Sequence, residues 1–455
     1  MNRISKRAWF ALALAIILAL GMLAFALRYC IESGKWATFQ GSPHVYSGGN
    51  LNTGVVTDRT GTVLLDATDG REYADSRLLR MATMHILGDR DGFIPSRLME
   101  KYSDALIGYN FFTGTYGAEQ GKGKMSLTLS AQAQTAALEA LDGRKGTVGV
   151  YNYRTGEILC AVTSPTYDPD DVPDVDEEDS AFDGVYVNRF FNATYVPGSI
   201  FKLITAAAAI EQIPDIESQT FHCEGSYETG GEVITCADAH GDLSFEQALA
   251  HSCNCAFGQI AQQLGTDTLD QYARRIGVAD SIEFDGIGTA SGHMDLSNAS
   301  EADLAWAGIG QYTDLVNACQ YMTFMGAIAG GGTAAKPYLV ARAGSGLTAH
   351  KGSTQKMDRV IEEGTADKLS EMMRNNVVSI YGTDMFPDLY VCAKSGTAEV
   401  GPDEVPNATF AGFIQSNEYP LAFIVIVENG GSGSAVAGPI AGDVLRACVA
   451  ALDEE

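Results

Sequence analysis

A serine and a lysine three positions apart, Ser199 and Lys202, open an apolar, Ala-rich segment at 203–210. At this spacing both side chains project from one face of the first turn of a helix. A serine hydroxyl needs an adjacent base to attack a carbonyl group, and a desolvated lysine amine can be that base. The N–H groups and dipole of a helix N-terminus suit a developing oxyanion. The pattern therefore predicts nucleophilic catalysis by Ser199 with Lys202 as the base.

A second pair of polar side chains, Ser252 and Asn254, precedes another apolar segment and is separated by one residue. A tight turn at this point would direct both side chains into one cleft. A hydroxyl can relay a proton, and a carboxamide can both donate and accept hydrogen bonds. We expect both residues to take part in catalysis.

A third group, Lys394-Ser395-Gly396-Thr397, lies in a late strand-like segment. Lys394 presents a cation, Gly396 lets the strand approach a substrate closely, and Thr397 offers a hydroxyl and a backbone N–H. We expect Lys394 to act in catalysis. Ser395, Gly396 and Thr397 are expected to contact the substrate.

Each pattern alone has an ordinary structural explanation: a helix cap with a lysine that extends to the surface, a second cap, and an edge-strand lysine that discourages aggregation. Ser353 and Lys356 also repeat the first spacing, in a polar loop. The combination is more specific, because S-x-x-K, S-x-N and K-[ST]-G in this order are typical of serine β-lactamases and penicillin-binding proteins. A Ser-His-Asp hydrolase is disfavoured because the sequence has no G-x-S-x-G elbow.

The elements that must position these residues can be read from apolar runs. Helices are predicted at 131–141 (capped by Ser130), 201–211, 256–264 and 440–452, and strands at 147–151, 157–162, 389–400, 409–414 and 421–427. Two early strands, three late strands and intervening helices predict an α+β fold, with one antiparallel sheet flanked by helices and a helical subdomain. This domain is expected to span residues 125–455.

The N-terminal part has a different character. Residues 8–27 are uninterrupted apolar residues, long enough to cross a bilayer, and predict a transmembrane helix at 8–28. Three basic residues before it place residues 1–7 in the cytoplasm and the rest outside. A small-x-small pattern at 24–26 leaves open the alternative that this segment is a cleavable signal peptide, although the apolar run is longer than that of most signal peptides. Residues 29–124, with strand-like pieces at 53–57 and 62–65, are expected to form a small pedestal.

The charge and the cysteines of the chain limit which partners and ligands are expected. A formal net charge of −27 argues against nucleic-acid binding, and the acidic loop at 168–179 lacks the pattern of a calcium loop. Of the nine cysteines, Cys223 and Cys236 flank a Gly-Gly turn and are candidates for a disulfide, which would stabilise by about 3 kcal/mol. His222, His240, His251, Cys253 and Cys255 lie near them in sequence. Because no C-x2-C or H-x3-H pair occurs, no metal site and no cofactor is predicted.

With these motifs the chain resembles the class B penicillin-binding proteins, the monofunctional transpeptidases of cell-wall synthesis. The segments that carry the resemblance are 58–61, 155–159, 164–169, 195–199, 252–254, 309–311 and 394–399. The chain departs from common forms of these motifs at Cys253, Ser395 and Tyr312. The resemblance implies a penicillin-binding transpeptidase fold on a membrane-anchored pedestal.

The resemblance also implies a reaction. Ser199 would attack the D-Ala-D-Ala terminus of a peptidoglycan stem peptide and form an acyl-enzyme, which an amine of another stem resolves into a cross-link. Penicillin and other β-lactams would be trapped covalently by Ser199, and a polytopic membrane glycosyltransferase is the implied partner. A D,D-carboxypeptidase, a class D-like β-lactamase and a non-catalytic β-lactam or wall-fragment sensor remain alternatives.

Overall fold

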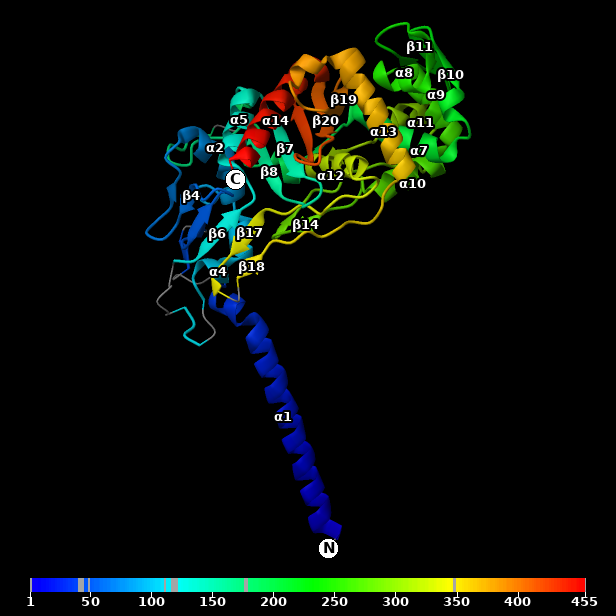
Figure 1. The fold of residues 1–455 in the computed structure, drawn as a ribbon. Helices are drawn as coiled ribbons and strands as arrows, with labels where there is room; N and C mark the ends of the chain where they lie inside the picture. Colours follow the sequence, from blue (N-terminus) through cyan, green and yellow to red (C-terminus); the bar gives the residue numbers. More distant parts are fainter. Residues whose placement is uncertain are drawn as a thin grey trace.

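The structure is a computed structural model that describes residues 2–39, 45–47, 50–109, 112–115, 122–175, 179–346 and 349–454. A long helix leads into a small sheet, and a larger body of sheet and helices lies beyond it (Figure 1).

Helix α1 (Asn2–Ala37) projects alone from the rest of the molecule (Figure 1) and contains the segment 8–28. Its apolar stretch has a mean hydropathy of 2.8 and is 0% buried. The helical segment Gly433–Asp453 is also long and apolar enough to cross a membrane, but 56% of its apolar stretch is buried inside the protein. Burial inside the protein therefore explains the apolar residues of the second segment, whereas the apolar residues of α1 are exposed.

A six-stranded sheet forms the part next to α1, with the strand order β18-β17-β6-β3-β4-β5. Its strands are β3 (Val55–Thr57), β4 (Val63–Asp66), β5 (Glu72–Tyr73), β6 (Lys124–Leu127), β17 (Val340–Ala343) and β18 (His350–Lys351). The expected strands near 53–57 and 62–65 are confirmed as the antiparallel pair β3 and β4.

The chain returns to this sheet late, because β17 and β18 lie more than 200 residues after β6 and add to its edge. The unpaired edge of a sheet can pair with a strand from any part of the chain. The order of the segments in the sequence therefore does not predict that β17 pairs with β6. A division of residues 29–455 at residue 124 therefore stays a prediction: β6 begins there and pairs with β3 and with β17.

The main sheet has five antiparallel strands in the order β19-β20-β21-β7-β8, which confirms the arrangement of two early and three late strands. Its strands are β7 (Gly146–Asn152), β8 (Ile158–Ser164), β19 (Val391–Ala398), β20 (Asn407–Ile414) and β21 (Leu421–Val427). Every residue of β20 and β21 is buried. Such strands read as continuous apolar runs because helices cover both faces of the sheet.

Helices α5 (Ala131–Leu141) and α14 (Gly438–Asp453) cover one face of this sheet, and α12 (Ala318–Ala329) covers the other. The Ser130 side chain accepts a hydrogen bond from the Ala133 N–H and caps α5, as the sequence predicts. Between α12 and β19 runs α13 (Glu363–Asn376), which continues into a π-helical turn, Val377–Tyr381.

A helical subdomain lies beside β19 (Figure 1). It contains α7 (Lys202–Gln212), α8 (Phe245–Ala250), α9 (Asn254–Leu264), α10 (Thr266–Ile276) and α11 (Glu301–Gly308). Two small hairpin-like sheets belong to it, formed by β10 (Thr220–Cys223) with β13 (Gly241–Ser244) and by β11 (Ser226–Thr229) with β12 (Glu232–Thr235). The predicted helices at 201–211 and 256–264 correspond to α7 and α9.

The other α-helices and strands are α2 (Arg77–Leu87), which packs on α5, and shorter elements: β1 (Tyr46–Ser47), β2 (Asn50–Leu51), α3 (Arg97–Lys101), α4 (Ser103–Leu106), α6 (Arg189–Asn192), β9 (Thr194–Tyr195), β14 (Glu283–Phe284), β15 (Ile287–Gly288) and β16 (Val316–Asn317).

Candidate active site

Ser199 lies in a 3-10 turn, Gly198–Phe201, that leads directly into α7. Gly198 has a φ of +55°, and a Cβ atom there would lie 2.8 Å from the Thr397 carbonyl oxygen of β19. The Gly198 N–H donates to the Gly310 carbonyl oxygen at 3.0 Å. Gly198, in a left-handed conformation, thus lets the start of the helix approach β19, and Gly310, which is also left-handed, lets its own loop approach Gly198.

Lys202 is the centre of the site. Its Nζ lies 2.9 Å from Ser199 Oγ and 2.7 Å from Asn254 Oδ1. It also lies 2.7 Å from the Ser252 carbonyl oxygen and 3.1 Å from Ser252 Oγ. The whole side chain is buried, at 0% exposure. The predicted contact between serine and lysine at i and i+3 is therefore present.

Burial lowers the pKa of Lys202 to about 7, because desolvation disfavours the charged amine. The nearby thiol groups of Cys236, Cys253 and Cys255 oppose this shift by favouring the cation. A pKa near neutrality leaves a substantial fraction of free amine at physiological pH. A free amine next to Ser199 Oγ is able to accept its proton.

Ser252 and Asn254 reach the same point from the turn before α9. Ser252 has a φ of +54°, a left-handed conformation that is uncommon outside glycine and is often found at functional sites. Asn254 is held at both ends of its carboxamide, because Oδ1 accepts from Lys202 and Nδ2 donates to the Thr235 carbonyl oxygen at 2.8 Å. Asn254 therefore also fixes the position of Lys202.

Lys394 enters from β19 and is likewise fully buried. Its Nζ donates to Ser252 Oγ at 2.9 Å and to the Ser395 carbonyl oxygen at 2.8 Å. Burial, and then the positive charge of Lys202, hold the pKa of Lys394 well below its usual range. The Ser252 hydroxyl thus bridges two lysines, an arrangement that suits the transfer of a proton.

The rest of the third motif lies next to the start of the helix. The Thr397 side chain is exposed, and its Oγ1 accepts from the Gly433 N–H at 3.5 Å. A Cβ atom on Gly396 would lie 3.1 Å from the Pro197 carbonyl oxygen, so glycine permits the close approach of strand and helix. All eight residues predicted for the site therefore lie on the three segments that converge around Ser199.

Two residues near the site were not anticipated. The hydroxyl of Tyr381 lies 3.0 Å from both the backbone nitrogen and the Oγ of Ser395. Gly433 packs so tightly that a Cβ atom would lie 2.3 Å from the Gly396 carbonyl oxygen. No local spacing links either residue to a motif, because they reach the third motif only through the tertiary fold.

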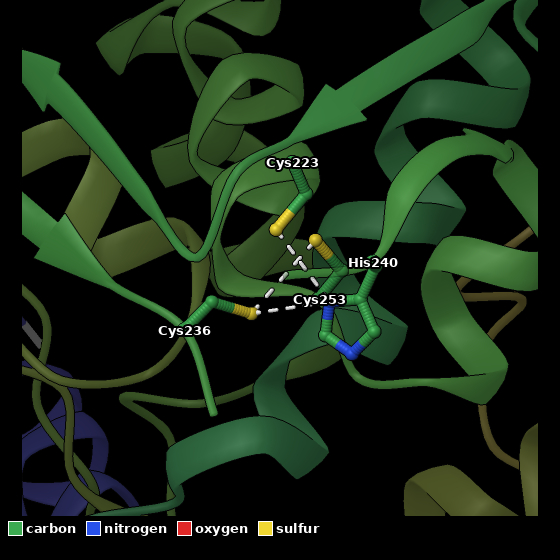
Figure 2. Close-up of side chains that lie close together, drawn as sticks. All are labelled: Cys223, Cys236, His240 and Cys253. Atoms are coloured by element: carbon green, nitrogen blue, oxygen red, sulfur yellow. Dashed lines mark hydrogen bonds between the residues drawn. The ribbon is translucent and has the colours of Figure 1, made fainter. Parts of the chain in front are cut away.

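The cysteines differ from the expectation. All nine are free thiols, so the hairpin disulfide between Cys223 and Cys236 is not formed. Instead, both thiols cluster with His240 and Cys253 within 4.8 Å (Figure 2). The C-x3-H spacing of Cys236 and His240 was the available signal for this cluster. No metal site was predicted from the sequence because it has no C-x2-C or H-x3-H pair, yet four candidate ligands converge through the fold.

Comparison with known proteins places this geometry in a family. Residues 146–446 match the penicillin binding protein transpeptidase domain. Stage V sporulation protein D of Bacillus subtilis is 29% identical over 348 residues, covering 71% of this chain and 53% of that protein. The peptidoglycan D,D-transpeptidase PbpA of Mycolicibacterium smegmatis is 28% identical over 380 residues, covering 75% of this chain and 74% of that protein. The chain thus spans about half the length of the first of these relatives.

Solved structures agree in fold. Penicillin-binding protein A from M. tuberculosis, as its ceftriaxone acyl-enzyme, superposes with a TM-score of 0.76 at 25% identity and covers 87% of this chain and 98% of that one. The D,D-transpeptidase domain of a peptidoglycan glycosyltransferase from Eggerthella lenta gives a TM-score of 0.70 at 25% identity, covering 87% and 97% of the two chains. With the family match over most of its length and its three motifs assembled around one serine, the chain belongs to the penicillin-binding protein transpeptidase family.

Proposed function

We propose that this protein is a serine D,D-transpeptidase that cross-links peptidoglycan stem peptides through an acyl-enzyme on Ser199 and is inhibited by β-lactams. The observation that carries the proposal is the buried contact between Lys202 Nζ and Ser199 Oγ, at 2.9 Å. Relatives whose names state this activity, and related structures with β-lactams bound as acyl-enzymes, support it.

In the first half-reaction, Ser199 Oγ attacks the carbonyl carbon between the two terminal D-alanines while neutral Lys202 takes its proton. The backbone N–H groups of Ser199 and Thr397 stabilise the oxyanion, and one such donor is typically worth about 3–4 kcal/mol. The amide bond breaks, Ser252 relays a proton to the departing amine, and D-alanine leaves. An amine of a second stem then attacks the ester, forms the new amide bond and frees Ser199.

The third motif supplies the recognition of the substrate. The carboxylate of the terminal D-alanine, or the corresponding acid group of a penicillin, is held by Lys394, Ser395 and Thr397. Gly396 leaves room for the substrate backbone beside β19. Binding of that carboxylate would favour the charged form of Lys394, because a nearby opposite charge raises the pKa of a lysine.

The rest of the chain determines where the reaction takes place. Helix α1 anchors the protein in the cytoplasmic membrane through residues 8–28, with residues 1–7 inside the cell. Residues 29–124 form a pedestal that lifts the transpeptidase domain, 125–455, above the outer face of the membrane. A polytopic membrane glycosyltransferase is the partner that supplies new glycan strands with uncross-linked stems.

The decisive experiment compares Ser199→Ala with Ser353→Ala, which removes the serine of the second S-x-x-K pattern. Full-length protein in detergent is treated with a fluorescent penicillin and analysed by intact-mass spectrometry. We expect one covalent adduct on the wild type and on Ser353→Ala, and none on Ser199→Ala. An adduct that persists on Ser199→Ala overturns the assignment of the nucleophile.

A second measurement separates transpeptidation from the alternatives. Stem pentapeptides are supplied together with an acceptor amine, and the products are analysed. Cross-linked dimer is the expected product. Release of D-alanine by water alone indicates a carboxypeptidase, rapid release of hydrolysed penicillin indicates a β-lactamase, and acylation without any peptide product indicates a sensor.

A further inference from the structure

Four side chains outside the catalytic group converge on one point: Cys223, Cys236, His240 and Cys253 (Figure 2). Their ligand atoms all lie within 4.8 Å of one another. They come from the ends of four different elements, because Cys223 ends β10, Cys236 follows β12, His240 precedes β13 and Cys253 caps α9. The convergence is therefore a product of the fold and not of one flexible loop.

The distances between these atoms fit a tetrahedral metal ion. The Sγ atoms of Cys223 and Cys236 each lie 3.5 Å from His240 Nδ1, which Figure 2 shows turned toward the sulfurs. The Sγ atoms of Cys236 and Cys253 are 3.9 Å apart. Around a tetrahedral zinc ion, sulfur and nitrogen ligands lie about 3.5 Å apart and two sulfur ligands about 3.8 Å apart. A disulfide would instead need a separation of about 2.0 Å.

Two backbone N–H groups point at sulfur atoms of the cluster. The Asn254 N–H donates to Cys236 Sγ at 3.3 Å, and the Ala256 N–H donates to Cys253 Sγ at 3.4 Å. Both donors belong to the first turn of α9, where the helix dipole also favours negative charge. Cys236 and His240 are partly exposed, so an ion has access from solvent.

The segment that carries these ligands has little else to hold it together. In its four strands the buried apolar side chains are those of Phe221, Cys223, Ile234 and Leu243. Small units with so few buried side chains usually need a metal ion or a disulfide for stability.

We propose that Cys223, Cys236, His240 and Cys253 bind one Zn²⁺ ion through three thiolates and one imidazole nitrogen, and that this ion fastens residues 220–244 to the loop before α9. The four ligands fill a tetrahedral coordination sphere, as in structural zinc sites, and leave no position for a reacting water. Binding releases the thiol protons to solvent and changes no oxidation state.

The site adjoins the catalytic group through one residue. Cys253 stands between Ser252 and Asn254, which both contact Lys202. The Asn254 side chain also donates to the Thr235 carbonyl oxygen, beside Cys236. By binding Cys253, the ion positions the second motif, so Cys253 is a positioning residue. This role rests on the proposed function, but the binding of zinc does not depend on it.

The first test measures metal in the full-length protein, purified in detergent without chelators. We expect one zinc per chain by elemental analysis, and zinc X-ray absorption that fits three sulfur ligands at about 2.3 Å and one nitrogen at about 2.0 Å. Cys223→Ser and His240→Ala should lose the zinc, whereas His240→Cys should keep it as a four-thiolate site.

Cys255→Ser is the matched control, because it removes a neighbouring thiol from the same turn of α9 and should retain the zinc. A wild-type protein without zinc, with a different metal, or with a Cys223–Cys236 disulfide in mass spectrometry overturns the proposal. So does loss of zinc from Cys255→Ser. The wild-type absorption spectrum decides the question even where a ligand variant fails to fold.

The second test compares zinc-loaded protein with chelator-stripped protein in penicillin acylation. Stripping should slow acylation by roughly fivefold or more, a typical size for coupled sites, and added zinc should restore it. An unchanged rate overturns the positioning role and leaves the zinc site standing. Absence of any acylation in zinc-loaded protein instead contradicts the proposed function, so the two failures are distinguishable.

Discussion

The catalytic group and the cysteine–histidine cluster share the loop at 252–254, yet the chain assembles them differently. The catalytic group gathers three motifs around a buried amine, Lys202, and its parts are held by nitrogen–oxygen hydrogen bonds. The cluster gathers soft ligands from the ends of short strands that bury little. The catalytic group lies against β19 of the main sheet, whereas the short strands that carry the cluster bury few apolar side chains of their own.

This contrast predicts an asymmetry between the two regions. A change at the centre of the catalytic group should slow the chemistry by orders of magnitude and leave the cluster intact. A change in the cluster should only slow the chemistry, because it acts through the shared loop.

The largest effect is expected for Lys202→Ala. Removal of the general base should slow penicillin acylation by about 10²- to 10⁴-fold, while the zinc content stays the same. Stopped-flow acylation rates and elemental analysis measure the two effects. Lys356→Ala, in the exposed second S-x-x-K pattern, is the control and should acylate normally. Near-normal acylation by Lys202→Ala would assign the base elsewhere.

The pH dependence of acylation should come next in size. Because burial lowers the pKa of Lys202 to about 7, the free amine is a minor species at acidic pH and dominates above neutrality. The acylation rate should therefore rise about tenfold per pH unit below 7 and level off above it. Rate constants measured between pH 5 and 9 test this. A flat profile would show that the amine titrates outside this range.

Asn254→Ala tests the shared loop itself. The variant loses the side-chain contacts with Lys202 and Thr235, but it keeps the backbone N–H that donates to Cys236 Sγ. A hydrogen bond to a charged group contributes about 1.5–3 kcal/mol, so acylation should slow by roughly 10- to 100-fold. Zinc should remain bound. If the variant loses both zinc and activity, the Asn254 side chain supports both regions and not the catalytic group alone.

The smallest effect is expected for Tyr381→Phe. The change removes the hydroxyl that contacts the nitrogen and Oγ of Ser395. A neutral hydrogen bond contributes about 0.5–1.5 kcal/mol, so acylation should slow by about 2- to 10-fold. The zinc content should not change. Titration of the variant with a series of β-lactams would show whether the loss falls on binding or on the acylation step.

Much of the fold was predictable because its elements carry local signals. The cap at Ser130 and the apolar run after it predict α5 correctly, and the continuous apolar runs at β20 and β21 predict buried strands. The pairing of β17 and β18 with the sheet next to α1 was not predictable. That pairing joins segments more than 200 residues apart, and nothing in either segment specifies its partner.

The sequence by itself determined the contact between Ser199 and Lys202, because a spacing of three residues at the start of a helix sets the distance between two side chains locally. It also determined the order of the motifs and the apolar helix at the N-terminus. Only the tertiary structure decided that Ser252 bridges the two lysines, that Tyr381 supports Ser395, and that three thiols meet one imidazole. Those contacts depend on how separate elements pack, and no periodicity along the chain records that packing.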